Sequence, residues 1–95
     1  MIPATRQEIK ETPFAERRCQ NYAQLIQAFD ERRRELRFST LEFDARAGWA
    51  DGYSSKLICL TRNMGKLSFG LMLDALGLEI VVRSRCQGEE IAHAS

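Results

Sequence analysis

Apolar residues in the middle of the chain recur at steps of three and four positions, a spacing that is typical of amphipathic helices. The first such run begins after Asn21, a residue type that often caps the start of a helix, and it continues to about residue 36. Its apolar members are Tyr22, Leu25, Ile26, Phe29 and Leu36. The pattern predicts a mainly α-helical fold of four to five short helices, of which this run forms one.

The segment ahead of this run has no helical period. Residues 1–12 are mostly polar, and we expect them to be loose or partly extended. Thr12 and Pro13 form a pair that often begins a helix, so one or two helical turns are expected over residues 14–18.

A stretch in the centre of the chain carries the signals of two short helices and a tight turn. Ser39 is a good N-cap, and Glu42 stands where a capping box needs its carboxylate, so a helix is expected over residues 40–47. Gly48 should end it, and Asp51 is the next residue able to cap a helix. Two helices of about two turns, joined by a glycine-containing turn, match the helix-turn-helix plan, in which the second helix enters a DNA major groove.

The residue types of this helix pair predict which face it buries. A small shared core is expected from Phe43, Ala47, Trp49 and Leu57. The residues left pointing outward are Asp51, Gly52, Tyr53, Ser55 and Lys56. Such a small, hydroxylic and basic face allows close approach to phosphates and base edges, so this set is predicted to read bases. A helix pair of ordinary structural purpose is the alternative.

Two further groups of basic residues flank the central pair. The polar loop over residues 61–66 offers Arg62, Asn63 and Lys66 as candidate phosphate contacts, although a polar loop needs no such role. The charge run that ends the first long helix contains Arg32, Arg33, Arg34 and Arg37. These arginines form either a solvated face paired with neighbouring acidic residues or a surface that touches the DNA backbone.

The C-terminal part of the chain changes from a helical pattern to a β pattern. Ser68 is expected to cap a helix over residues 69–76, which Gly77 ends. The next residues are rich in β-branched side chains and predict a strand made of Leu78, Glu79, Ile80, Val81, Val82 and Arg83. Because no second strand is evident, we expect it to pair with a second copy and form a homodimer, with the N-terminal segment as the rival partner.

Length and charge limit the classes of function. The chain has 95 residues, enough for one domain, which we expect over residues 13–84 with a flexible tail over residues 85–95. The net charge is only +1, but residues 53–85 hold five basic and two acidic side chains. The part that follows the central turn is therefore locally positive, as a modest nucleic-acid footprint requires.

The sequence shows no pattern typical of a catalytic or metal site. Its one histidine, His93, lies in the tail, and Cys19, Cys59 and Cys86 are odd in number and widely spaced. We therefore expect no enzyme activity, no metal and no cofactor, with Cys59 as a small core residue. Isolated thiols and the lack of an apolar run of about 20 residues predict a cytoplasmic protein.

The run FDARAGWADGYSSKL, followed by a loop and then SFGLMLDALGLEIVV, resembles small bacterial helix-turn-helix proteins of the Cro and lambda-repressor (XRE-like) type. The likeness covers residues 21–82 and implies a sequence-specific regulator that binds double-stranded DNA, usually a dimeric repressor or controller at its own or neighbouring promoters. It also places Thr40 where the family anchors a phosphate. Asp44 and Ser54 depart from the pattern, which has Ala and a β-branched residue there, and they predict looser packing between the two helices.

A protein-interaction module, for instance an antitoxin or antiactivator built on the same helix pair, is the alternative function. The near-neutral net charge, the region of Trp49 and the acidic Asp51 motivate this second hypothesis. Asp51 itself has two possible roles. It either caps the second helix, which we favour, or accepts a hydrogen bond from a cytosine amine.

Overall fold

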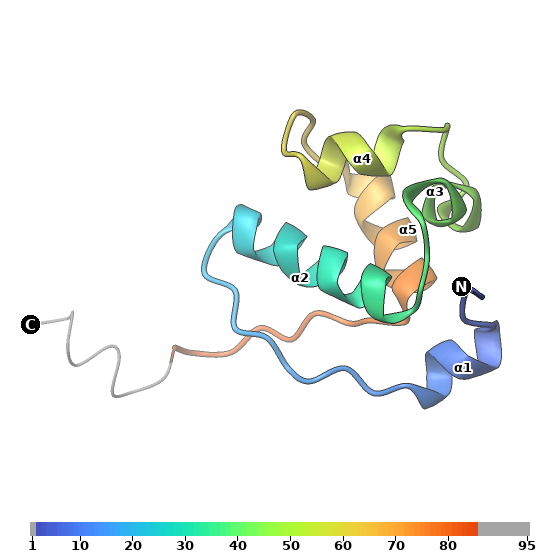
Figure 1. Cartoon of the computed structure of the whole chain (residues 1–95). Helices are drawn as coiled ribbons and strands as arrows, with labels where there is room; N and C mark the ends of the chain where they lie inside the picture. Colours follow the sequence, from blue (N-terminus) through green and yellow to red (C-terminus); the bar gives the residue numbers. More distant parts are fainter. Residues whose placement is uncertain (1, 86–95) are drawn as a thin grey trace, which may run out of the picture.

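Helix α2 (Tyr22–Glu35) forms one side of a small all-α domain and packs against two later helices (Figure 1). The computed structural model describes residues 2–85, and five helices occur in that range. The other four are α1 (Arg6–Glu11), α3 (Thr40–Ala47), α4 (Tyr53–Ile58) and α5 (Lys66–Leu76). Helices α4 and α5 each contact both α2 and α3, so these four elements enclose the core.

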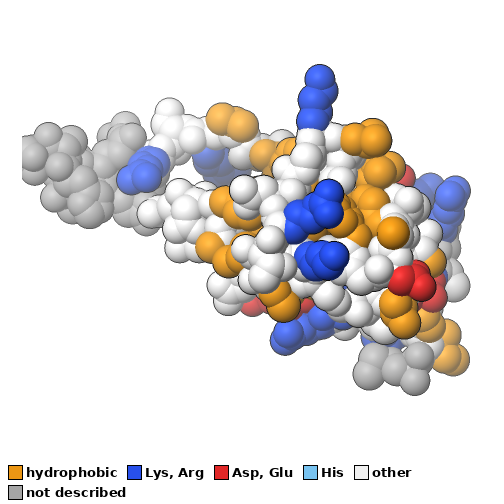
Figure 2. Space-filling view, turned by 90° about the horizontal axis from the view of Figure 1, so that it is seen from above, with side chains coloured by type: hydrophobic (Ala, Val, Ile, Leu, Met, Phe, Trp, Pro, Cys, Tyr) orange, Lys and Arg blue, Asp and Glu red, His pale blue; other side chains and the backbone are white. Residues whose placement is uncertain are grey.

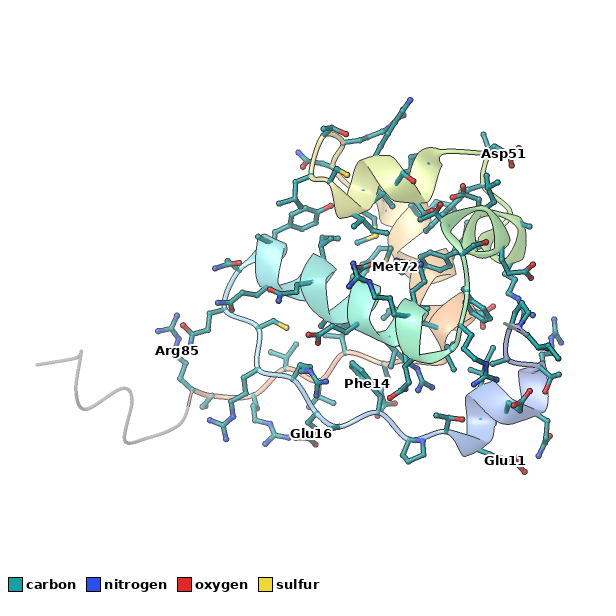
Figure 3. All side chains as sticks on the ribbon, viewed as in Figure 1. Glu11, Phe14, Glu16, Asp51, Met72 and Arg85 are labelled. Atoms are coloured by element: carbon teal, nitrogen blue, oxygen red, sulfur yellow. The ribbon has the colours of Figure 1, made fainter. Side chains whose placement is uncertain are left out.

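The buried part of the core draws apolar side chains from α2, α3, α4 and α5 and from connecting segments, and Ile9 of α1 packs against it. Its buried members are Ala4, Ile26, Phe29, Leu36, Phe38, Phe43, Leu57, Met72 and Leu76. Met72 lies at the centre of this group, between α2 and α4 in Figure 3. The predicted core residues of the central pair are also inside, with Phe43, Ala47 and Leu57 buried and Trp49 half-buried.

The helices whose ends are set by local signals begin and end where the sequence predicts. Asn21 caps α2 by accepting a hydrogen bond from the backbone N–H of Gln24. Ser39 caps α3 in the same way, and Gly48 ends that helix with a left-handed φ of 78°. The second half of the predicted capping box is absent, because Glu42 pairs with Arg46 one turn later instead.

The N-terminal segment differs from the expectation of a loose chain over residues 1–12. Residues 6–11 form α1, which begins with a complete capping box between Thr5 and Glu8. The backbone hydrogen bond from Thr5 lowers the pKa of Glu8, and the guanidinium of Arg37 contributes to the same shift. The helical turns expected over residues 14–18 are also wrong, since that stretch is irregular. Thr12 ends α1 and does not begin another helix.

The side chain of Arg32 ties three parts of the fold together. It is almost fully buried, and its Nε donates to the carbonyl oxygen of Leu76 at the end of α5 over 3.0 Å. Its Nη2 donates to the carbonyl oxygen of Ile9 over 3.1 Å, and its Nη1 to Glu35. The Ile9 carbonyl needs this partner because Pro13, four residues later, has no N–H. Arg32 is therefore a structural residue.

The other arginines of the charge run also have partners inside the chain. Arg33 and Arg34 pair with Asp30, and Arg33 in addition donates to the carbonyl oxygen of Phe38. Arg37 donates to the backbone of the N-terminal segment and to Glu8. The expected pairing with acidic neighbours is confirmed for Arg33 and Arg34, whereas Arg32 is buried and not part of a solvated face. Contact of the run with a DNA backbone stays a prediction. The arginines connect the end of α2 to neighbouring segments.

Two expectations for the C-terminal part are wrong. Helix α5 begins at Lys66 with Gly65 as its N-cap, so Ser68 lies inside the helix and does not cap it. No strand is present among residues 2–85, and the predicted strand over residues 78–83 is an irregular segment. A strand needs a neighbour for its backbone groups, and the described residues supply none there. The predicted tail, apart from residue 85, lies outside the described residues.

Gly77 provides a test of how α5 ends. Its φ is +65°, and an added Cβ would lie 2.5 Å from Cγ2 of Ile9. Because side chains disfavour the left-handed conformation, Gly77→Ala should lower the free energy of unfolding by about 1–2 kcal/mol in chemical denaturation. Gly70→Ala in the same helix is the matched control. It meets no atom within 4 Å and should raise stability by about 0.5–1 kcal/mol. Equal changes in the free energy of unfolding for Gly77→Ala and Gly70→Ala would contradict a left-handed conformation at Gly77.

Candidate nucleic-acid interface

A buried carboxylate on α3 holds the start of α4. Asp44 is fully buried, and its Oδ2 accepts the backbone N–H of Gly52 over 2.8 Å. Its Oδ1 accepts the backbone N–H of Ser54, also over 2.8 Å. These are amide groups of the first turn of α4, which a short helix cannot satisfy by itself. Asp44 therefore performs from the preceding helix the task that sequence reasoning gave to Asp51.

A second polar contact joins the same two helices. Ser54 is fully buried, and its hydroxyl donates to the carbonyl oxygen of Thr40 over 3.1 Å. Asp44 and Ser54 are the two residues that depart from the family pattern. Asp44 accepts a hydrogen bond from α4, and Ser54 donates one to α3. The expected looser packing is wrong, because both polar groups have partners and fill their positions. Thr40, a predicted phosphate contact, is partly exposed beside this bond.

Tyr53 belongs to the support of α4 and not to its outward face. Its ring packs edge-on against Trp49, with centroids 5.0 Å apart, and Trp49 packs in the same manner on Phe43. The Tyr53 hydroxyl shares a hydrogen bond of 2.9 Å with Ser68 on α5. Tyr53 therefore links α4 to α5. The spacing of the sequence alone gave no signal for this contact across the fold.

The remaining outward residues of α4 lie as predicted. Asp51 and Lys56 are exposed, and Gly52 and Ser55 are half-exposed. Gly52 has a φ of 93°, a conformation that glycine adopts without strain. Asp51, which Figure 3 labels at the turn before α4, accepts no capping hydrogen bond from this helix. Its carboxylate is therefore available to a ligand.

The loop after α4 is held beside that helix. The guanidinium of Arg62 stacks on the ring of Tyr53 at 5.2 Å from the ring centroid. The hydroxyl of Tyr22, at the start of α2, accepts the backbone N–H of Met64 over 2.9 Å. Sequence reasoning missed this role of Tyr22, which it placed in the apolar stripe of α2. Asn63 and Lys66 are exposed nearby.

The charges around α4 are mainly positive. Lys56, Arg62 and Lys66 are exposed on α4, in the loop and at the first residue of α5, and the nearest acidic residue along this stretch is Asp51. Figure 2, which views the molecule from the side that α4 covers, shows Lys and Arg side chains near the middle of this face and acidic ones toward its margin. Phosphate groups would meet an attractive potential there.

Cys59 and the residues predicted to form the dimer lie away from α4. Cys59 is exposed, not in the core, because α4 ends at Ile58 and the chain turns through Leu60 with a φ of 62°. The predicted interface residues from Leu78 to Arg83 lie on the side of the domain opposite to α4 (Figure 1). The structure thus separates the predicted base-reading and dimer-forming residues onto two faces.

The part of the chain that the structure describes offers neither a metal site nor a helix that could cross a membrane. Residues 2–85 contain no group of three or more His, Cys, Asp or Glu side chains able to hold a metal ion. Within the same range, none of the helices has both the length and the apolar character needed to cross a membrane. No family model, characterised protein or solved structure matches the chain.

Removal of the Asp44 carboxylate tests whether it fixes α4. Asp44→Ala leaves the buried amide of Ser54 and the partly buried amide of Gly52 without an acceptor, and it should lower the free energy of unfolding by about 2–4 kcal/mol in urea denaturation. Asp51→Ala removes the same charge from an exposed position in the turn between α3 and α4 and should change stability by less than about 0.5 kcal/mol. If Asp51→Ala lowered the free energy of unfolding more than Asp44→Ala, Asp51 and not Asp44 would be the residue that caps α4.

Proposed function

We propose that the protein is a sequence-specific DNA-binding transcriptional regulator of the helix-turn-helix type. The main observation behind this proposal is that α4 is held on the core with one face exposed. Its apolar side is fixed to α3 and α5, while Ser55 and Lys56 face outward beside a basic loop. A short helix held rigidly with small and basic residues outward suits entry into a major groove. The resemblance to XRE-like proteins supports the same function.

The residues around α4 divide into two roles. Lys56 and Ser55 would reach base edges, with Asp51 as an acceptor for a cytosine amine, since it is not used as a cap. Arg62, Asn63, Lys66 and Thr40 would hold the phosphate backbone. A dimer joined through the C-terminal segment would place two copies of α4 on successive half-sites about 34 Å apart. Such a regulator acts as a repressor or controller at its own or a neighbouring promoter.

Substitution of Lys56 tests the proposed reading helix. Lys56→Ala should weaken binding to the DNA upstream of the protein's own gene by about tenfold or more, measured by fluorescence anisotropy, because a base contact is worth about 1–3 kcal/mol. Lys10→Ala on α1 removes the same charge from an exposed site on the other side of the domain. It should leave the affinity nearly unchanged. Equal losses of DNA affinity for the two variants would show that α4 does not contact the bases.

One observation favours the alternative of a protein-interaction module. Leu60 and Leu67 are 49% and 76% exposed on either side of the basic loop, and side chains of this size are costly to leave in water. The region of Trp49 gives this alternative less support than the sequence suggested, because the Trp49 ring is packed between Phe43 and Tyr53.

Salt dependence separates the two functions. If each subunit neutralises phosphates through Arg62 and Lys66, the logarithm of the DNA affinity of a dimer should fall against the logarithm of salt concentration with a slope of about −4. Anisotropy titrations at four salt concentrations give this slope. A flat dependence, or no binding to any upstream fragment, would favour a protein partner.

A further inference from the structure

A small open recess lies between the stretch of chain ahead of α2 and the outer side of that helix. It has a volume of about 270 Å³, and most of the residues that line it are polar. Residues 17–19 form one wall, and α2 forms the other with side chains such as Gln27 and Glu31. No residue of α4 or of the loop after it lines the recess. The site is therefore separate from the proposed DNA interface.

The wall over residues 17–19 offers a thiol and a guanidinium group. The thiol of Cys19 is half-buried there and forms no disulfide with another described residue. Arg17 is already paired with Glu31 over 3.1 Å. Arg18 is exposed, and it forms no ion pair within residues 2–85. A segment with a carboxylate would therefore suit Arg18, and a segment with a thiol would suit Cys19.

The last part of the described chain runs beside this wall. Residues 78–85 follow the stretch over residues 13–19 in the same direction (Figure 1). Nη2 of Arg83 lies 3.9 Å from Oε1 of Glu16, and this contact shows how the two stretches are aligned. Arg85 ends the described range and lies beyond Glu16, toward the start of α2 (Figure 3). The described chain therefore ends while it is running toward the recess.

The same alignment relates two cysteines. Cys19 follows Glu16 by three residues, and Cys86 follows Arg83 by three residues. Because the two stretches run side by side in the same direction, equal steps along each keep their residues level. Cys86 is also joined to the last described residue by a single peptide bond. Continued in this alignment, the chain would bring the two thiols to one level along the wall.

We propose that residues 86–95 bind in this recess with Cys86 beside Cys19, and that an oxidant joins the two thiols in a disulfide. The disulfide fixes residues 78–85 along the stretch ahead of α2, and its reduction releases them. Reversible disulfides of this kind respond to redox state in reducing compartments. The proposal does not depend on DNA binding and is tested without DNA.

The charge of the C-terminal residues also fits the recess. Residues 86–95 contain two carboxylate side chains, Glu89 and Glu90, and no lysine or arginine. These carboxylates follow Cys86 by three and four residues, so a chain held at Cys86 brings them to the exposed guanidinium of Arg18. Ion pairs between arginine and carboxylate are directional and charge-assisted. The acidic pair therefore supplies the partner that Arg18 lacks among the described residues.

The oxidant is a small disulfide such as oxidised glutathione. The thiolate of Cys19 attacks one of its sulfur atoms, which forms a mixed disulfide and releases one glutathione thiolate. The thiolate of Cys86 then attacks the sulfur of Cys19, which forms the bond within the chain and releases the second glutathione thiolate. The two protons lost by the cysteines are taken up by the glutathione thiolates. The protein loses two electrons, and one glutathione disulfide is reduced.

The rate at which the native cysteines form a disulfide tests the proposal. Three full-length variants, Cys59→Ser, Cys86→Ser and Cys19→Ser, each keep two of the three thiols. In oxidised glutathione, the Cys59→Ser protein should form its disulfide within the chain at least about tenfold faster than the other two, because docking raises the effective concentration of its thiols. Intact mass separates this product from a mixed disulfide with glutathione and from a covalent dimer.

The same measurement in concentrated urea is the control for chain length. The loop between Cys19 and Cys86 is the largest of the three possible loops, so an unfolded chain should close it most slowly. The order of rates should therefore reverse between the folded and the unfolded protein. Equal rates for the three folded variants would overturn the docking. A folded Cys59→Ser protein that stops at the mixed disulfide would also overturn it.

A charge reversal tests the contact with the acidic pair. In the Cys59→Ser protein, Arg18→Glu places a like charge beside Glu89 and Glu90 and should slow disulfide formation about threefold or more at low salt. Arg6→Glu makes the same change at an exposed site on α1 and should leave the rate nearly unchanged.

The reactivity of the Cys19 thiol is measured separately with iodoacetamide, a neutral reagent, in protein that carries Cys86→Ser and Cys59→Ser. This rate corrects for any effect of Arg18→Glu on the thiol itself. If the corrected rates of disulfide formation for Arg18→Glu and Arg6→Glu were equal, Arg18 would not be the partner of the acidic pair.

Discussion

The position of α4 depends on a single buried carboxylate. Helix α4 has six residues, too few to be stable by itself, and its first amide groups would be left unsatisfied without an outside acceptor. Asp44 supplies that acceptor from α3 and Ser54 returns a hydrogen bond to α3, so the two helices become one rigid unit. Tyr53 and Trp49 extend this support to the core and to α5. The outward face of α4 gains a fixed direction as a result, which any reader of base edges requires.

A similar arrangement holds the other end of the domain. The buried guanidinium of Arg32 satisfies carbonyl oxygens at the ends of α1 and α5, so the N-terminal segment and the last helix are joined to α2. This fixes the place where the chain leaves the domain after Gly77. The exposed residues Ile80, Val81 and Val82 therefore follow from a defined position, on the face opposite to α4 (Figure 1). One end of the domain presents α4, and the other presents these apolar residues, which have no strand partner among residues 2–85.

The sequence predicts the parts of this structure that depend on near neighbours. Asn21, Ser39 and Gly48 set helix ends through contacts within a few residues, and those boundaries are correct. The errors concern contacts between distant residues. Asp44 replaces Asp51 as the cap, and Tyr53 turns inward to meet Ser68, because the folded chain brings partners from other helices that no local spacing reveals. The segment after α5 forms no strand among residues 2–85, because a strand needs a neighbour for its backbone groups and those residues supply none.

The central claim is that the outward face of α4 lies against duplex DNA. Backbone amide chemical shifts, followed by NMR while DNA from upstream of the protein's own gene is added, test it most directly. The account predicts that the largest shifts occur at residues 51–56 and 61–66, with those of α1 nearly unchanged. Shifts concentrated on α1 or on the outer surface of α2, with α4 unaffected, would contradict it.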